Sequence, residues 1–271
     1  MGKKTGLVAT SRITHATPAA FASHVLRRGD EGRIARHLST SGVDVLLGGG
    51  WDKFVPRRQA NVSGDAEGSS QLHGTRSDGR DLIAEMVKND YVFVRSAVEL
   101  HSLEGAKRTL GLFYSGPMLK ASEGRSPSLA AMTHYALREL AEAPKGLFLM
   151  VEGSQIDWGG HDNDLDYVIA ETTDFDEAVG EVFRFLTDHG IKDETLVVTT
   201  GDHETGGLSL NPHPRMPLSY QPRWTTDGHT GIAVPVFSYG GGAEDFKGIQ
   251  THGGIGRKLI EGLTGLEIHW S

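Results

Sequence analysis

The sequence contains no cysteine among its 271 residues. This absence excludes disulfide bonds, thiolate nucleophiles and cysteine-ligated zinc sites together. Any transition-metal site must therefore be built from histidine and carboxylate side chains. Histidine is plentiful, with 13 residues, and glycine more so, with 36. Most of the excess glycine stands at the ends of apolar runs, where chain reversals and close backbone approach to ligands require it.

Positive charge is also scarce, because 27 lysines and arginines face 35 aspartates and glutamates and give a net charge of −8. No basic surface is available to bind a polyanion, so we expect no nucleic-acid partner. No apolar run reaches the ~18 residues of a membrane span, and Met1–Gly6 lacks the apolar segment of a signal peptide. We therefore expect no membrane association, and the sequence itself leaves the cellular location unknown.

Short β-rich runs alternate with helical patterns along the chain. Seven strands are expected, at Thr5–Thr10, Val43–Gly48, Tyr91–Arg95, Leu110–Tyr114, Gly146–Val151, Thr195–Thr200 and Val234–Tyr239. Six helices are expected, at Pro18–Arg27, Glu31–Ser39, Arg80–Lys88, Ser128–Ala141, Asp164–His189 and Ile255–Leu263. Near-continuous apolar strands separated by helices are typical of a parallel sheet covered on both faces. We predict an α/β fold with a mostly parallel central sheet in a single domain, residues 1–271.

Two stretches lack any periodic pattern. Ala60–Gly79 is rich in small and polar residues and is expected to form an exposed loop. Ser209–Asp227 contains four prolines, and we expect an irregular connection there.

Metal-binding residue types cluster after two of the predicted strands. Glu152, Asp157 and His161 follow one, and Asp202 and His203 follow another, while His229 stands just before the last strand. Ligands bind beyond the carboxyl ends of strands in open parallel sheets, so these clusters point to one site. A lone histidine or aspartate after a strand is usually a helix cap or a solvated loop residue, so the combined set carries the argument.

Spacing supports a shared ion. Asp157 and His161 are four residues apart, which on a helical turn places both side chains on one face. Asp202 and His203 are adjacent, so both reach one metal only if the chain turns sharply, and Gly201, Gly206 and Gly207 permit such a turn. Three protein ligands from histidines and carboxylates, with one open position, are typical of catalytic zinc.

These segments resemble the metal motifs of alkaline phosphatases, in order and at plausible spacing over essentially the whole chain. The motifs are Val151-Glu152-Gly153-x-x-Ile156-Asp157-x-x-x-His161, Thr200-x-Asp202-His203-Glu204-Thr205-Gly206-Gly207-Leu208, His229-Thr230-Gly231, and upstream Thr10-Ser11-Arg12-Ile13-Thr14-His15-Ala16-Thr17-Pro18. Only about 25 residues separate the second and third motifs, which resembles a compact member of the family.

The resemblance implies two zinc sites. Asp157, His161 and His229 would bind the first zinc, which activates the hydrolytic water. Asp202 and His203 would bind the second, which in the family holds the nucleophile. Two metals about 4 Å apart stabilise the attacking and leaving oxygens of a phosphoryl transfer.

The resemblance also implies a third metal site, served by Thr17 and Glu152 and normally occupied by magnesium, and a phosphate-binding arginine, Arg28. His15 stands where many members have aspartate, and an imidazole there favours zinc or cobalt over magnesium. The alternative for His15 is a residue that hydrogen-bonds a water near the metal. Trp158 departs from the lysine or histidine common at its position, and we expect it to pack on the rim. For Arg28 the alternative is a solvated arginine at a helix end.

Two residues that the family requires have no match here. They are an aspartate from the first strand and the serine nucleophile at the start of a helix. Ser11, Ser41 and Ser115 are the best strand-end candidates, yet their neighbours indicate ordinary turns. The chain therefore resembles a member truncated at its N-terminus, with a central strand missing and Met1–Lys4 as the end of a helix in a longer chain.

We expect a phosphomonoester hydrolase in class, acting on small phosphate monoesters and binding inorganic phosphate, in which this chain alone has little or no activity. A phosphodiesterase or sulfatase on the same metal scaffold is one alternative. A metal-binding or phosphate-binding fragment that takes a strand from another chain is the other. The resemblance further implies export to the periplasm or extracellular space and a possible homodimer.

Overall fold

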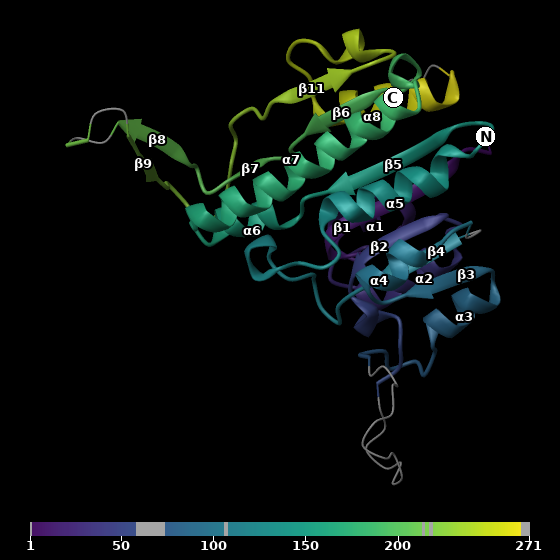
Figure 1. Ribbon diagram of the computed structural model, residues 1–271. Helices are drawn as coiled ribbons and strands as arrows, with labels where there is room; N and C mark the ends of the chain where they lie inside the picture. The colour runs from purple at the N-terminus through teal and green to yellow at the C-terminus, as the bar shows by residue number, and fades with distance from the viewer. Residues whose placement is uncertain (1, 58–73, 106–107, 213–214, 217–218, 267–271) are drawn as a thin grey trace. The chain divides into compact units, whose positions relative to one another are not determined.

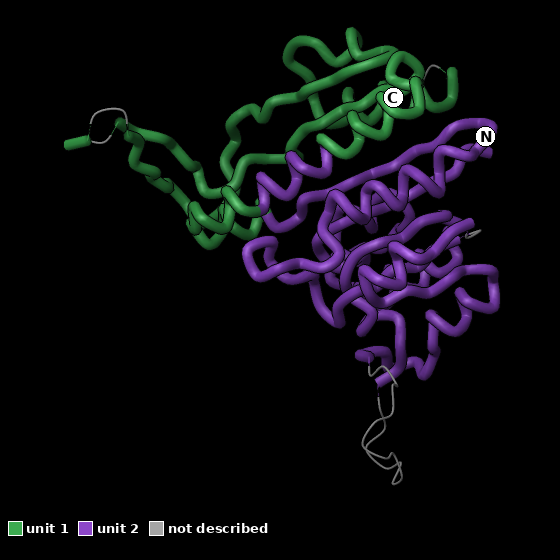
Figure 2. Tube along the Cα trace, viewed as in Figure 1, with its two compact units in different colours: residues 1, 156–170, 180–271 green, residues 2–155, 171–179 purple. Residues whose placement is uncertain are grey.

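The computed structural model describes residues 2–57, 74–105, 108–212, 215–216 and 219–266. Two compact units are present (Figure 2). The first, here called the sheet unit, comprises residues 2–155 and 171–179. The second, called the cluster unit, comprises residues 156–170 and 180–271. The assignment of residues 1–271 to a single domain stays a prediction.

A five-stranded parallel sheet forms the centre of the sheet unit, with the order β3-β4-β2-β1-β5 (Figure 1). Its strands are β1 Lys4–Arg12, β2 Val45–Gly49, β3 Tyr91–Val94, β4 Arg108–Leu112 and β5 Leu147–Glu152. The predicted α/β class with a mostly parallel sheet is confirmed. Among the described residues, β5 pairs with β1 alone, so one of its edges has no strand neighbour.

Helices cover both faces of this sheet. Successive residues of β1 enter different cores: Leu7 packs with residues of α1 Ala16–Ala22, α2 Glu31–Thr40 and α3 Leu82–Lys88. Val8 packs on the other side with residues of α4 Ala97–Ser102 and α5 Leu129–Ala141. Side chains alternate between the two faces of a strand, so each apolar residue of β1 is buried against a helical layer.

The first helix ends earlier than the sequence suggests. A helix over Pro18–Arg27 is wrong at its C-terminal end, because α1 stops at Ala22 and Ser23 is extended. The Ser23 hydroxyl and the His24 backbone N–H both lie within hydrogen-bond distance of His37 Nδ1 in α2, at 3.0 and 3.3 Å. These contacts stabilise a non-helical exit, since serine competes well with helical hydrogen bonding through its side chain.

The cluster unit is built from the later elements. Its helices are α6 Gln155–His161, whose first residue belongs to the sheet unit, α8 His252–Thr264 and the ends of the long α7 Leu165–Asp188. Its strands form three antiparallel pairs: β6 Val197–Thr200 with β11 Val236–Tyr239, β7 Glu204–Thr205 with β10 His229–Thr230, and β8 Ser209–Pro212 with β9 Tyr220–Arg223. Short 3₁₀ turns are Trp51–Lys53, Ala121–Glu123, Lys192–Glu194 and Ala243–Phe246.

Two expectations for this region are wrong. The strands β6 and β11 do not join the parallel sheet but pair antiparallel with each other. A parallel connection requires a crossover, usually helical, and the described residues between these two strands contain no helix. The stretch Ser209–Asp227 is not wholly irregular, because it contains the β8–β9 hairpin, in which Pro212 and Pro222 take part.

The loop expected at Ala60–Gly79 lies largely outside the described residues, and residues 74–79 contain neither helix nor extended strand. None of the described helices combines the length and the apolar character needed to span a bilayer.

Candidate metal centre

The metal-binding residue types of the cluster unit meet where α6 faces the β7–β10 pair. Asp157 and His161 lie one turn apart on α6, and His161 Nε2 is 3.4 Å from Asp157 Oδ1. The two side chains therefore lie on one face of a helix, as the spacing predicts.

The β7–β10 pair brings a third side chain to them. In this pair His229 lies opposite Thr205. His229 Nε2 is then 3.5 Å from Asp157 Oδ1 and 3.2 Å from His161 Nε2. Three candidate metal-ligand atoms thus lie within 3.5 Å of one another, although the residues come from segments about seventy positions apart.

The hydrogen bonding of His161 directs its lone pair into this cluster. His161 Nδ1 lies 2.5 Å from the Asp227 carbonyl oxygen, which can only accept, so Nδ1 carries the proton. Nε2 of a neutral imidazole is then an acceptor that faces another ring nitrogen and a carboxylate oxygen. Imidazole nitrogen and carboxylate oxygen are ligand types that zinc takes in proteins.

A second pair of ligand types adjoins the first. His203 Nε2 lies 3.2 Å from Asp202 Oδ2, and the His203 ring stacks on that of His229 with centroids 3.5 Å apart. His203 Nδ1 is 4.0 Å from Asp157 Oδ1, and Asp157, His203 and His229 form a group whose ligand atoms all lie within 4.8 Å. All five predicted zinc ligands are therefore brought together within one unit.

Neighbouring residues hold this arrangement, and the sequence argument gave them no role. Thr205 Oγ1 donates to Asp157 Oδ1 at 2.6 Å and lies 3.3 Å from His203 Nδ1. Glu204 accepts from the backbone N–H of Gly207 at 2.8 Å and from the Thr230 hydroxyl, so its carboxylate joins the ends of β7 and β10. A threonine two residues after a candidate ligand, on a strand of alternating faces, is the signal that could have identified Thr205.

Glycines allow the sharp turn after His203, as expected. Gly206 and Gly207 have φ of +91° and +60°, in the left-handed region. A Cβ on Gly206 would approach a carbon of the Trp224 indole to 2.5 Å, so the position excludes a side chain on steric grounds as well. Gly201, the third glycine considered, does not have a positive φ.

The residues predicted for the third metal and for phosphate lie in the sheet unit. Glu152 ends β5, and His15 and Thr17 lie at the start of α1, a helix that packs against both β1 and β5. Arg28 follows the early end of α1, and its Nη2 is 3.3 Å from His15 Nε2. The chain therefore folds back after Ala22, and Arg28 approaches His15 although a continuous helix would have separated them.

The candidate serine nucleophiles have structural contacts. Ser11 is fully buried, and its hydroxyl donates to the carbonyl of Arg12 at 3.1 Å. Ser41 donates to the carbonyl of Leu38 at the end of α2, at 2.8 Å. Ser115 follows β4 in a turn, where its carbonyl accepts from Asp52 N. These contacts agree with the expectation of ordinary turns, and none of the three bonds involves a histidine.

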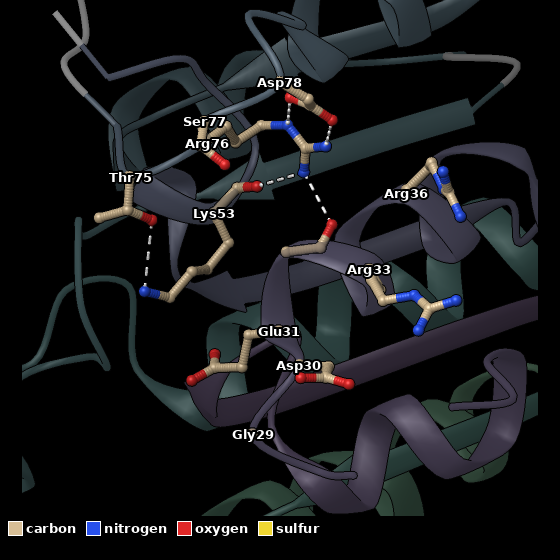
Figure 3. Close-up of a pocket in the computed structure, with 11 residues that line it drawn as sticks. Gly29, Asp30, Glu31, Arg33, Arg36, Lys53, Thr75, Arg76, Ser77 and Asp78 are labelled. Carbon is tan, nitrogen blue, oxygen red and sulfur yellow. Dashed lines mark hydrogen bonds and ion pairs between the residues drawn. The ribbon is translucent and has the colours of Figure 1, made fainter. Parts of the chain in front are cut away.

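A separate pocket in the sheet unit has mixed charge and is lined by residues of α2 and of the segments around Lys53 and Arg76 (Figure 3). Arg76 donates to the carbonyls of Gly32 and Lys53 and to both oxygens of Asp78. The hydrogen bond from Arg76 holds the pKa of Asp78 below its ordinary value. Because this guanidinium is committed to protein partners, it is not available to a ligand.

A family model described as alkaline phosphatase matches residues 1–220. Alkaline phosphatase 3 of Bacillus subtilis is 40% identical over 218 residues, covering 77% of this chain and 42% of the relative. The repressible alkaline phosphatase of Saccharomyces cerevisiae is 40% identical over 227 residues, covering 76% and 39%.

Among solved structures, alkaline phosphatase from the Antarctic bacterium TAB5 is similar with a TM-score of 0.84 and 36% identity, covering 97% of this chain and 73% of that one. The chain spans about two fifths of the length of the two curated relatives above. The matching family model, the sequence identities and the shared fold all lead to one conclusion: the chain belongs to the alkaline phosphatase family.

Proposed function

We propose that the candidate metal ligands and Arg28 form the metal-binding and phosphate-binding part of a phosphomonoester hydrolase that uses two zinc ions. The observation that carries the proposal is the convergence of Asp157 Oδ1, His161 Nε2 and His229 Nε2 to within 3.5 Å of one another. Zinc bound there would lower the pKa of a coordinated water and neutralise charge on a phosphoryl group.

Each residue has a definite part in this proposal. Asp157, His161 and His229 bind the first zinc, and Asp202 and His203 bind the second. The Asp227 carbonyl holds the proton on His161 Nδ1 and so leaves Nε2 as the ligand atom. Arg28 binds two oxygens of the phosphate, since a guanidinium presents paired donors that lysine lacks.

The third site of the proposal consists of Glu152, Thr17 and His15, with magnesium, cobalt or zinc bound. Carboxylate and hydroxyl oxygens suit magnesium, whereas an imidazole favours zinc or cobalt. Two solved structures of TAB5 alkaline phosphatase, in which a histidine is replaced by glutamate or aspartate, have magnesium bound in a site called M3. Magnesium in that site of a similar protein supports a third metal site here.

Small phosphate monoesters are the proposed substrates of the complete enzyme. The 271 residues tested alone are proposed to have almost no turnover, because no serine here has the neighbours of the family's nucleophile. Inorganic phosphate remains a ligand of the metal-loaded chain. Association as a homodimer and a periplasmic or extracellular location are further proposals that rest on family membership alone.

Two assays test the proposal. Calorimetry should detect inorganic phosphate binding to the zinc-loaded chain. An Arg28→Lys variant should bind phosphate several-fold more weakly, because lysine lacks the paired N–H donors of a guanidinium. Hydrolysis of p-nitrophenyl phosphate by the chain alone should stay close to the blank. Phosphate binding that is the same with and without zinc would contradict the proposed site, and robust hydrolysis would contradict the proposed inactivity.

A further inference from the structure

Ser154 is a buried residue just after β5. The parallel pairing of β1 with β5 ends where Ala9 lies opposite Glu152. Beyond that point the backbone N–H of Ser11 has no carbonyl of β5 to accept its hydrogen bond. It donates instead to Ser154 Oγ, at 3.2 Å, so the side chain of Ser154 continues the strand pairing by one step.

The same hydroxyl contacts a predicted metal ligand. Ser154 Oγ lies 2.6 Å from Glu152 Oε2 and donates its single proton to that carboxylate oxygen. The Ser154 hydroxyl also lies 3.0 Å from the Ser11 hydroxyl oxygen. A bond to an ionised carboxylate is charge-assisted, which makes it stronger than the serine-to-serine contact and fixes where the proton points.

We propose that Ser154 is a positioning residue that orients the Glu152 carboxylate for a hard divalent cation held with Thr17. The inference rests on the proposed third metal site and adds a residue to it. Two fixed points define the orientation: the Ser11 N–H of β1 holds the Ser154 oxygen, and that oxygen holds Glu152 Oε2. The cation then meets a carboxylate whose rotation is already restricted before binding.

Serine is well suited to this position. Its hydroxyl accepts from Ser11 N–H and donates to Glu152 at the same time, which alanine cannot do. Ser154 is only 6% exposed and Ser11 0%, so water does not readily replace the missing hydroxyl. Residues that hydrogen-bond a metal ligand change metal affinity by about 10–100-fold when they are replaced.

The experiment compares Mg²⁺ binding to four forms of the full 271-residue chain by calorimetry, with Mg²⁺ alone as the probe. They are the native chain, Ser154→Ala, Ser154→Thr and a matched control, Ser39→Ala. Ser39 is similarly buried, at 7% exposure, and its hydroxyl donates to the Arg36 carbonyl within α2. We expect Ser154→Ala to weaken Mg²⁺ binding by about 10–100-fold and the other two variants to bind nearly as the native chain does.

Hydrogen exchange of the Ser11 amide adds a readout independent of metal. Ser154→Ala should accelerate that exchange, while Ser154→Thr and Ser39→Ala should not. Thermal melts identify any variant that fails to fold.

Native Mg²⁺ affinity in a folded Ser154→Ala protein would overturn the inference and leave the third site intact. A folded Ser154→Thr protein that loses as much affinity as Ser154→Ala would also overturn it. If the native chain does not bind Mg²⁺, the third site itself is refuted and the inference with it.

Discussion

Replacing Thr205 by valine should weaken zinc binding without disturbing the fold. Valine keeps the branched shape that suits β7, but it removes the hydroxyl that donates to Asp157 Oδ1 at 2.6 Å. Asp157 is then free to rotate away from the position where His161 and His229 meet it. The variant therefore tests a hydrogen bond behind the metal ligands rather than a ligand itself.

The size of the effect follows from the type of bond. A hydrogen bond to a charged group contributes about 1.5–3 kcal/mol. At about 1.4 kcal/mol for each tenfold change in an equilibrium constant, its loss weakens zinc binding by roughly 10–150-fold. Solvent can partly replace the donor, because the Asp157 side chain is 33% exposed, so we expect the lower half of this range.

Competition with a chromophoric zinc chelator near neutral pH measures the change. Thr205→Ser retains the hydroxyl and should restore most of the affinity. Thr133→Val is the matched control, because Thr133 is fully buried and its hydroxyl donates only to Leu129 O within α5, at 2.8 Å. A Thr205→Val protein with native zinc affinity would refute the reasoning, and so would a Thr205→Ser protein as impaired as the valine variant.

Three further predictions concern stability. Burial raises the pKa of the Tyr135 hydroxyl to about 12. The folded state therefore keeps a proton that the unfolded state loses above its pKa of about 10. Urea melts should show the free energy of unfolding falling as pH rises from 10 to 12, and falling less steeply in Tyr135→Phe. Gly206→Ala should lower the melting temperature and the zinc affinity together, because the new Cβ would lie 2.5 Å from an indole carbon. Gly190 also has a left-handed backbone conformation but open space around it, so Gly190→Ala should show only the backbone cost of about 1–2 kcal/mol. Arg125→Ala should destabilise by about 3–5 kcal/mol in urea unfolding, since it leaves the fully buried Glu171 carboxylate without its ion pair, and an unchanged midpoint would contradict this.

Much of the sheet unit could be predicted from the sequence. Five expected strands lie within a few residues of β1 to β5, because near-continuous apolar runs such as Val45–Gly49 are unambiguous when a helix separates each from the next. The early end of α1 could not be predicted in the same way. It depends on His37, fourteen residues beyond Ser23, which accepts hydrogen bonds that only the folded chain offers.

The candidate site shows the same difference between local features, which the sequence predicts, and tertiary contacts, which it does not. The residue types and the spacing of Asp157 and His161 were readable, because both lie on one short helix. The approach of His229 was not, since it depends on two-residue strands that have no hydrophobic period. Thr205 and the Asp227 carbonyl were missed for a related reason: a hydroxyl or a backbone oxygen becomes part of a site only through tertiary contact.

Zinc retention is the most direct test of the central claim that Asp157 and its histidines hold a metal. We would dialyse three proteins against trace zinc: the native chain, Asp157→Ala and the exposed control Asp193→Ala. Elemental mass spectrometry would then measure the zinc bound to each. The account predicts two zinc ions in the native chain and in the control, and the loss of at least one in Asp157→Ala. Equal zinc in all three proteins, or none in the native chain, would contradict it.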